Sequence, residues 1–74
     1  MDVTFKDLIK PFLIQVLQQE NEYPVVRHEA GEGLSNFASD YDELVPIFEK
    51  YSQSCVDEVK YTCLIGLEKI KTYN

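Results

Sequence analysis

One histidine and two glutamates lie close together near the middle of this 74-residue sequence. His28, the only histidine, is followed directly by Glu29, and Glu32 comes four residues after it. Imidazole and carboxylate groups are ligands that iron, zinc and manganese accept. Residues three and four apart are neighbours on a helix, so all three side chains share one face. The spacing fits part of a metal site, and it equally fits the polar face of a surface helix.

A helical wheel orients this face relative to the expected core. Small and apolar residues form one stripe that should pack inside, made of Val26, Ala30, Gly33, Leu34 and Phe37. His28 falls nearly opposite that stripe, with Glu29 and Glu32 between the two on one flank. We therefore expect the three polar side chains to point away from the core. Negative charge near the start of a helix also suits the helix dipole, which gives both glutamates a purely structural reason to be there.

Four helices must position these residues, because apolar side chains recur every three or four positions. They are expected at about residues 4–19, 24–38, 41–52 and 56–72. Asp40 and Ser54 are expected to cap the third and fourth helices, and Pro11 to kink or break the first. The core side of the first helix is predicted to hold Phe5, Leu8, Ile9, Phe12, Leu13 and Val16. No alternating run or hairpin turn suggests a strand, so the predicted fold class is all-α.

The four segments repeat as two pairs, with residues 26–34 aligning with residues 59–67. The period of roughly 33–36 residues is typical of helical-pair solenoids. Residues 1–74 are therefore read as one α-α superhelix of two helix-pair repeats, about 4–38 and about 40–73. Glycine weakens a helix, so its recurrence at Gly33 and Gly66 indicates close approach between helices. The last helix is apolar nearly all round, which predicts further partners, either more repeats or a second copy.

Composition narrows the classes of function. A net charge of −6, from 13 acidic and 7 basic residues, argues against binding to a nucleic-acid backbone and suits a cationic partner. No apolar run is long enough for a membrane span and no signal peptide is visible, so a cytoplasmic protein is expected. Cys55 and Cys63 would lie about 12 Å apart along one helix, which is too far for a disulfide, so both are expected to be free.

Residues 22–34 read EYPVVRHEAGEGL and closely resemble the His-Glu segments of deoxyhypusine hydroxylase, a HEAT-repeat enzyme. The resemblance continues through residues 44–51 and 58–63. In that family, two similar halves carry four His-Glu motifs that together hold a di-iron centre. The enzyme is a monooxygenase of hypusine biosynthesis, which uses dioxygen to hydroxylate the deoxyhypusine side chain of a translation factor.

The resemblance implies a role for each of the three polar residues. His28 would bind iron through its imidazole and Glu29 through its carboxylate. Glu32 also belongs to the family pattern, and would support these ligands or bind the substrate amine. The chain corresponds to one motif and the following repeat of one half, with the first half the better match.

Departures from the family pattern limit what this chain can do alone. It holds one His-Glu pair where the family has four, and Tyr61 and Thr62 occupy the equivalent place in the second repeat. One histidine and one glutamate cannot hold two irons, so the isolated chain is expected to be inactive and to bind iron weakly or not at all. Two alternatives stay open, namely a metal-free HEAT-repeat interaction module and a protein similar to the HEAT-repeat bilin lyases.

Overall fold

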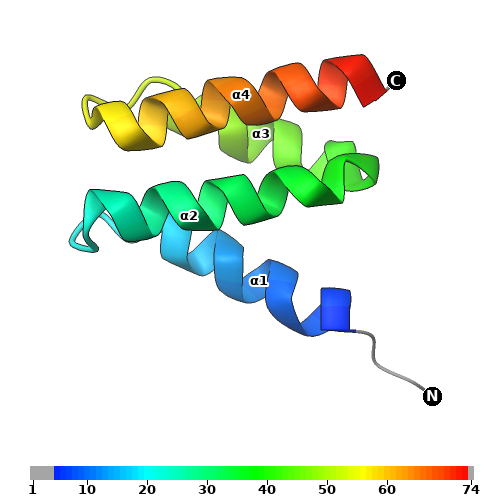
Figure 1. Cartoon of the computed structure of the whole chain (residues 1–74), viewed down its shortest axis with the longest axis horizontal. Helices are drawn as coiled ribbons and strands as arrows, with labels where there is room; N and C mark the ends of the chain where they lie inside the picture. Colours follow the sequence, from blue (N-terminus) through cyan, green and yellow to red (C-terminus); the bar gives the residue numbers. More distant parts are fainter. Residues whose placement is uncertain (1–4, 74) are drawn as a thin grey trace.

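The computed structural model describes residues 5–73, which are mostly helical and contain no strand (Figure 1). The α-helices are α1 (Phe5–Gln18), α2 (Pro24–Leu34), α3 (Tyr41–Tyr51) and α4 (Asp57–Tyr73), and a 3-10 helix, η1 (Ser35–Asp40), joins α2 to α3. The all-α prediction is confirmed. The predicted start of the first helix at residue 4 and the side chain of Phe5 lie outside the described part of the chain.

The helices form two antiparallel pairs that meet along their second members. Helix α1 packs on α2, α3 packs on α4, and α2 and α4 pack against each other. The colours of Figure 1 show that α1 runs opposite to α2 and α3 opposite to α4, whereas α2 and α4 run in the same direction. This arrangement is compatible with two helical repeats, and their boundary near residues 38–40 stays a prediction.

One apolar core connects the two pairs, and two glycines allow its helices to approach closely. The buried members are Leu17, Ala30, Leu34, Leu44, Phe48, Tyr51, Val59, Cys63 and Ile70. A Cβ on Gly33 would lie 3.0 Å from Leu13 Cδ1, and a Cβ on Gly66 would lie 2.7 Å from Phe48 Cε2. Each glycine therefore lets the second helix of a pair lie against the first, which confirms the close approach predicted from their recurrence.

The second helix is shorter than predicted, because α2 ends at Leu34 instead of continuing to residue 38. The Ser35 hydroxyl donates to the Gly31 carbonyl at 3.1 Å. The backbone of Phe37, with φ −104° and ψ 39°, interrupts the helical path inside η1. Serine, asparagine and aspartate are frequent in this segment, and their side chains compete with the backbone for helical hydrogen bonds. The apolar periodicity continues through the break, which is why it misplaced the helix end.

The predicted cap by Asp40 was wrong, the one by Ser54 holds only loosely, and the predicted break at Pro11 is absent. Asp40 makes no capping hydrogen bond, since its backbone is not in the extended conformation of an N-cap. Its carboxylate instead accepts from Lys10 Nζ at 3.1 Å. Ser54 Oγ accepts from the N–H of Val56, immediately before α4. Helix α1 runs through Pro11 without a break.

Lys10 joins α1 to the start of α3. Its ammonium lies 2.7 Å from a Glu43 carboxylate oxygen and 3.1 Å from Asp40. Hydrogen bonds to Glu43 and then to Asp40 raise the pKa of Lys10 above its ordinary value. The nearby acidic side chains are therefore partly neutralised by a cation from within the chain.

The predicted core side of α1 is only partly buried. Leu8 and Phe12 are exposed, whereas Leu17, which the prediction omitted, is completely buried. The reason is visible in Figure 1, where α2 covers the later part of α1 and leaves the earlier part projecting from the molecule. Periodicity identified the apolar side of α1, but how much of that side is buried depends on where α2 crosses it.

None of the described helices has both the length and the apolar character needed to cross a membrane. Cys55 and Cys63 are both free, as predicted, with Cys55 exposed and Cys63 buried in the core. Burial raises the pKa of the Cys63 thiol to about 11, and the charge of Arg27 opposes part of this effect.

We expect the Cys63 thiol to make folding stability fall at alkaline pH. Its proton is lost near pH 8.5 in an unfolded chain but near 11 in the folded one. The stability linked to this proton is therefore complete below about pH 8.5 and is lost as the pH rises towards 11, by about 3 kcal/mol. Urea unfolding between these pH values, compared between the parent chain and Cys63→Ala, measures the difference.

The matched control for this prediction is Cys55→Ser, which removes the exposed thiol. It should retain the alkaline loss of the parent chain, whereas Cys63→Ala should lose less stability over the same interval. Tyrosine titration contributes equally to all three proteins. Identical pH dependence in the parent chain and Cys63→Ala would contradict the prediction.

Candidate metal centre

His28, Glu29 and Glu32 come together on the second and third turns of α2. Pro24 occupies the first turn, where its fixed φ angle favours helix formation and its missing N–H costs no hydrogen bond. His28 lies four residues after Pro24, and Glu32 follows one helical turn after His28. One possible ligand atom from each of the three side chains lies within 4.8 Å of the others. The grouping predicted from their spacing is thus present in the structure.

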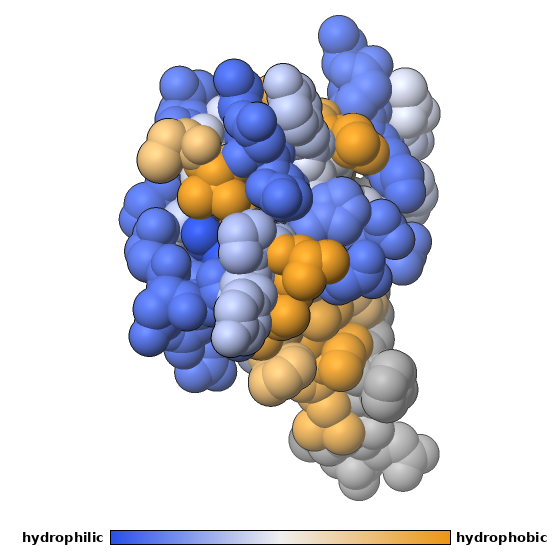
Figure 2. Space-filling view, turned by 60° about the vertical axis from the view of Figure 1, so that its left-hand side comes forward, coloured by the Kyte–Doolittle hydropathy of each residue, from blue (hydrophilic) through white to orange (hydrophobic). Residues whose placement is uncertain are grey.

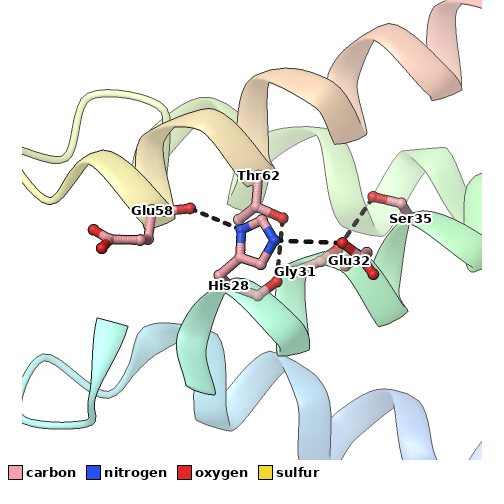
Figure 3. A network of polar contacts seen from close by, with 6 residues as sticks. All are labelled: His28, Gly31, Glu32, Ser35, Glu58 and Thr62. Atoms are coloured by element: carbon pink, nitrogen blue, oxygen red, sulfur yellow. Dashed lines mark hydrogen bonds and ion pairs between the residues drawn. The ribbon is translucent and has the colours of Figure 1, made fainter. Parts of the chain in front are cut away.

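The helical wheel predicted that the imidazole of His28 points away from the core, and this prediction was wrong. The imidazole lies between α2 and α4 (Figure 3) with its side chain 31% exposed. Nδ1 lies 3.3 Å from the backbone carbonyl oxygen of Glu58 in α4, and Nε2 lies 3.3 Å from Glu32 Oε2. The two glutamate side chains are exposed. The site therefore has a wall formed by α4 on one side and is open on the other.

The wheel was wrong because the buried face of α2 is centred on Arg27. The buried residues of this helix are Arg27, Ala30, Gly31 and Leu34, at spacings of three and four. Val26, assigned to the core from its apolar side chain, is instead exposed. The true buried face therefore borders His28 instead of lying opposite to it.

The contacts of the imidazole determine which nitrogen is available. A carbonyl oxygen can only accept a hydrogen bond, so the contact with Glu58 requires the proton on Nδ1. In the neutral ring, the lone pair of Nε2 then faces the Glu32 carboxylate. Two electron-pair donors this close are stabilised by a shared proton or by a cation bound between them.

The distance between the donor atoms of His28 and Glu32 is compatible with two ligands of one metal ion. Two ligands of one ion with bonds of about 2.0–2.2 Å lie about 3.0–3.4 Å apart, and His28 Nε2 and Glu32 Oε2 are 3.3 Å apart. One imidazole and two carboxylates suit iron, zinc or manganese. Three protein donors leave further coordination positions open, so the described residues would form an incomplete site.

The sequence analysis missed two residues that support this centre, Thr62 and Gly31. The Thr62 hydroxyl donates to the backbone carbonyl of His28 at 3.2 Å, beside the Cβ-free surface of Gly31. Alignment of the repeats marked Thr62 only as a position without a metal ligand. No pattern in the sequence identifies the contact between Thr62 and Gly31, because it depends on how α4 packs against α2.

Arg27 was also missed as a structural residue, although it is 1% exposed. Its Nε donates to the Leu17 carbonyl at 2.9 Å, and its guanidinium carbon lies 5.9 Å from the centre of the Tyr51 ring. Nη2 lies 3.6 Å from a Glu20 carboxylate oxygen, beyond hydrogen-bonding distance, and makes no hydrogen bond. Arg27 therefore links α2 to the last turn of α1 and to α3, directly beside the ligand position.

Comparison with known proteins finds deoxyhypusine hydroxylases that are similar to this chain in sequence. The chain is 41% identical over 61 residues to the deoxyhypusine hydroxylase of Schizosaccharomyces pombe and 38% identical over 61 residues to that of Homo sapiens, in each case over 82% of this chain. It is 37% identical over 71 residues, or 93% of its length, to the deoxyhypusine hydroxylase of Candida albicans.

The chain spans about one fifth of the length of these curated relatives, with 19%, 20% and 22% of the three proteins covered. No protein-family model matches the sequence. No solved structure matches it either. The relationship therefore rests on sequence identity over most of this chain and a small part of each relative.

Proposed function

Because this chain is related in sequence to one segment of the deoxyhypusine hydroxylases, we propose that it supplies one iron-ligand set of such an enzyme. The activity proposed for the complete enzyme is hydroxylation of the deoxyhypusine side chain of a translation factor. The observation that carries the proposal is the group of donors from His28, Glu29 and Glu32, all within 4.8 Å of one another. Iron would supply the oxidising chemistry, with dioxygen as co-substrate.

Each residue of the group has a proposed task. His28 would bind through Nε2, because its Nδ1 faces the Glu58 carbonyl. Glu29 would bind through its carboxylate. Glu32, 3.3 Å from Nε2, would either complete the ligand set or hold the imidazole and the cationic substrate amine beside it. The exposure of both carboxylates leaves room for a substrate or for ligands from another segment.

A di-iron centre would need ligands that the described residues do not provide, so we propose that other helices complete it. Two exposed apolar surfaces within residues 5–73 support this proposal. On α1, Leu8 and Phe12 are exposed, and Figure 2 shows apolar surface gathered in the lower part of the molecule, where α1 lies. On α4, Tyr61, Leu64 and Ile65 are exposed. Further repeats, or a second copy of the chain, would cover these surfaces.

Ferrous iron binding tests the ligand set directly. We expect anaerobic addition of Fe²⁺ to the 15N-labelled chain to broaden the NMR signals of His28, Glu29 and Glu32 at low occupancy, since three donors bind weakly. His28→Ala should abolish this selectivity, whereas Glu58→Gln, which changes an exposed glutamate but leaves the backbone carbonyl in place, should preserve it. Equal broadening around Asp42 and Glu43 would overturn the assignment.

The proposed activity can be tested in a chimaera with the Schizosaccharomyces pombe relative. The 61 matched residues of that enzyme would be replaced by those of this chain. The expected result is hydroxylation by the chimaera and loss of hydroxylation in its His28→Ala form. A folded chimaera that binds iron but performs no hydroxylation would count against the proposed function.

A further inference from the structure

Helix α4 contacts His28 at two points, one on its backbone and one on its ring. The Thr62 hydroxyl donates to the His28 carbonyl at 3.2 Å, and the Glu58 carbonyl lies 3.3 Å from Nδ1 of the imidazole. Glu58 and Thr62 are four residues apart and therefore share one face of α4. Figure 3 shows both contacts reaching His28 from the same helix. The following helix pair thus holds a residue of the preceding one.

Gly31 makes this contact possible. A Cβ at this position would lie 2.6 Å from Thr62 Cγ2 and 2.9 Å from Thr62 Oγ1, closer than real Cβ atoms approach their neighbours. Thr62 is itself only 3% exposed. Its methyl group occupies the space that a side chain at Gly31 would fill, while its hydroxyl reaches the carbonyl of His28. The contact between Gly31 and Thr62 therefore determines the distance between α2 and α4 close to the imidazole.

The separation of the helices controls the ring contact. The Glu58 carbonyl is part of the α4 backbone, so no substitution of its side chain removes it, and it follows any movement of α4. At 3.3 Å, the Nδ1 contact is near the upper limit of hydrogen-bonding distance. A displacement of a few tenths of an ångström would break it. The ring would then lose the partner that keeps the proton on Nδ1 and leaves Nε2 unprotonated.

We propose that Thr62 is a positioning residue for His28. Its hydroxyl, which donates to the His28 carbonyl beside Gly31, holds α4 at the distance where the Glu58 carbonyl fixes the Nδ1–H tautomer and directs the Nε2 lone pair towards Glu32. The orientation of the imidazole is a property of the metal-free chain. Its use in binding iron rests on the function proposed above.

The test uses the full 74-residue chain and two separate measurements. Two-bond 1H–15N NMR spectra at alkaline pH report which imidazole nitrogen of His28 carries the proton, and anaerobic Fe²⁺ titration reports affinity. The parent chain should show the Nδ1–H form. Thr62→Val should shift the ring towards the Nε2–H form and weaken Fe²⁺ binding by about tenfold or more, the effect typical of losing a ligand-orienting partner. Thr62→Ser, which keeps the hydroxyl, should restore both properties.

Two further variants keep the proposal open to contradiction. Gly31→Ala retains the hydroxyl but forces the helices apart, so it should produce the same tautomer change as Thr62→Val. Thr72→Val is the matched control, because the exposed Thr72 hydroxyl donates only to Lys69 in its own helix. Circular dichroism confirms that each variant is folded.

The outcomes separate the positioning role from the function on which it rests. A tautomer change in Thr62→Val and Gly31→Ala, in a chain that binds no Fe²⁺, would support the positioning role and oppose iron binding. Selective Fe²⁺ binding by the parent chain, with unchanged tautomer and affinity in folded Thr62→Val and Gly31→Ala, would overturn the positioning role alone.

Discussion

Replacing Arg27 by alanine is expected to lower the free energy of unfolding by about 3 kcal/mol. The substitution empties a completely buried position and leaves the Leu17 carbonyl without the Nε–H that donates to it. The core of a domain this small supplies only about 3–5 kcal/mol of stability. We therefore expect much of the variant to be unfolded at 25 °C, as measured by far-UV circular dichroism and urea titration.

Two substitutions separate the causes of this loss. Arg27→Met retains most of the volume but has no donor, so it should lose about 1–2 kcal/mol. Lys60→Ala removes the cation at the aligned position of α4, where the ammonium lies 5.8 Å from the exposed ring of Tyr61. Its loss should stay below about 1 kcal/mol. Equal destabilisation by Arg27→Ala and Lys60→Ala would contradict a special role for the buried arginine.

Replacing Phe48 by alanine is expected to cost about 3–5 kcal/mol, the range found for buried aromatic residues. The ring is fully buried and lies against the Cβ-free surface of Gly66. Gly66 has no side chain that could move into the cavity, so the space would remain open. The urea midpoint of the variant, compared with that of the parent chain, measures the loss.

Phe12 provides the matched control, because it occupies the position of α1 that aligns with Phe48 of α3. Its side chain is 57% exposed. Phe12→Ala should change the free energy of unfolding by about 0.5 kcal/mol or less, as is usual for surface positions. A large loss in Phe12→Ala would mean that the exposed part of α1 is covered in solution, by a second copy for example.

The helices were predictable, but their ends and much of their buried surface were not. All four predicted segments match helices, because apolar periodicity records burial averaged along a whole element. The interval from Ser35 to Asp40 was misjudged, since the periodicity continues through a 3-10 helix. Leu8 and Phe12 were misjudged for a different reason. Their exposure depends on where α1 crosses α2, which local spacing does not specify.

The sequence predicted which residues form the candidate site, but not their orientation or the residues packed around them. Helical spacing alone places His28, Glu29 and Glu32 together. The orientation of His28 was not predicted, because the wheel centred the buried side on small and apolar residues, Val26 among them, and left Arg27 out of it. Arginine was instead buried, with its guanidinium bonded to a carbonyl at the end of α1. The support from Thr62 required knowing that α4 packs on α2, a contact between residues 34 positions apart.

The burial of Arg27 directly before His28 also fixes the angular setting of the helix that carries the ligands. Consecutive residues on a helix project about 100° apart, so anchoring one of them determines the direction of the next. Turning α2 about its axis would pull the guanidinium from the Leu17 carbonyl and expose core residues. The buried side chain of Arg27 therefore determines the direction of the neighbouring imidazole. A substitution at position 27 would change the orientation of His28 although the two side chains need not be in contact.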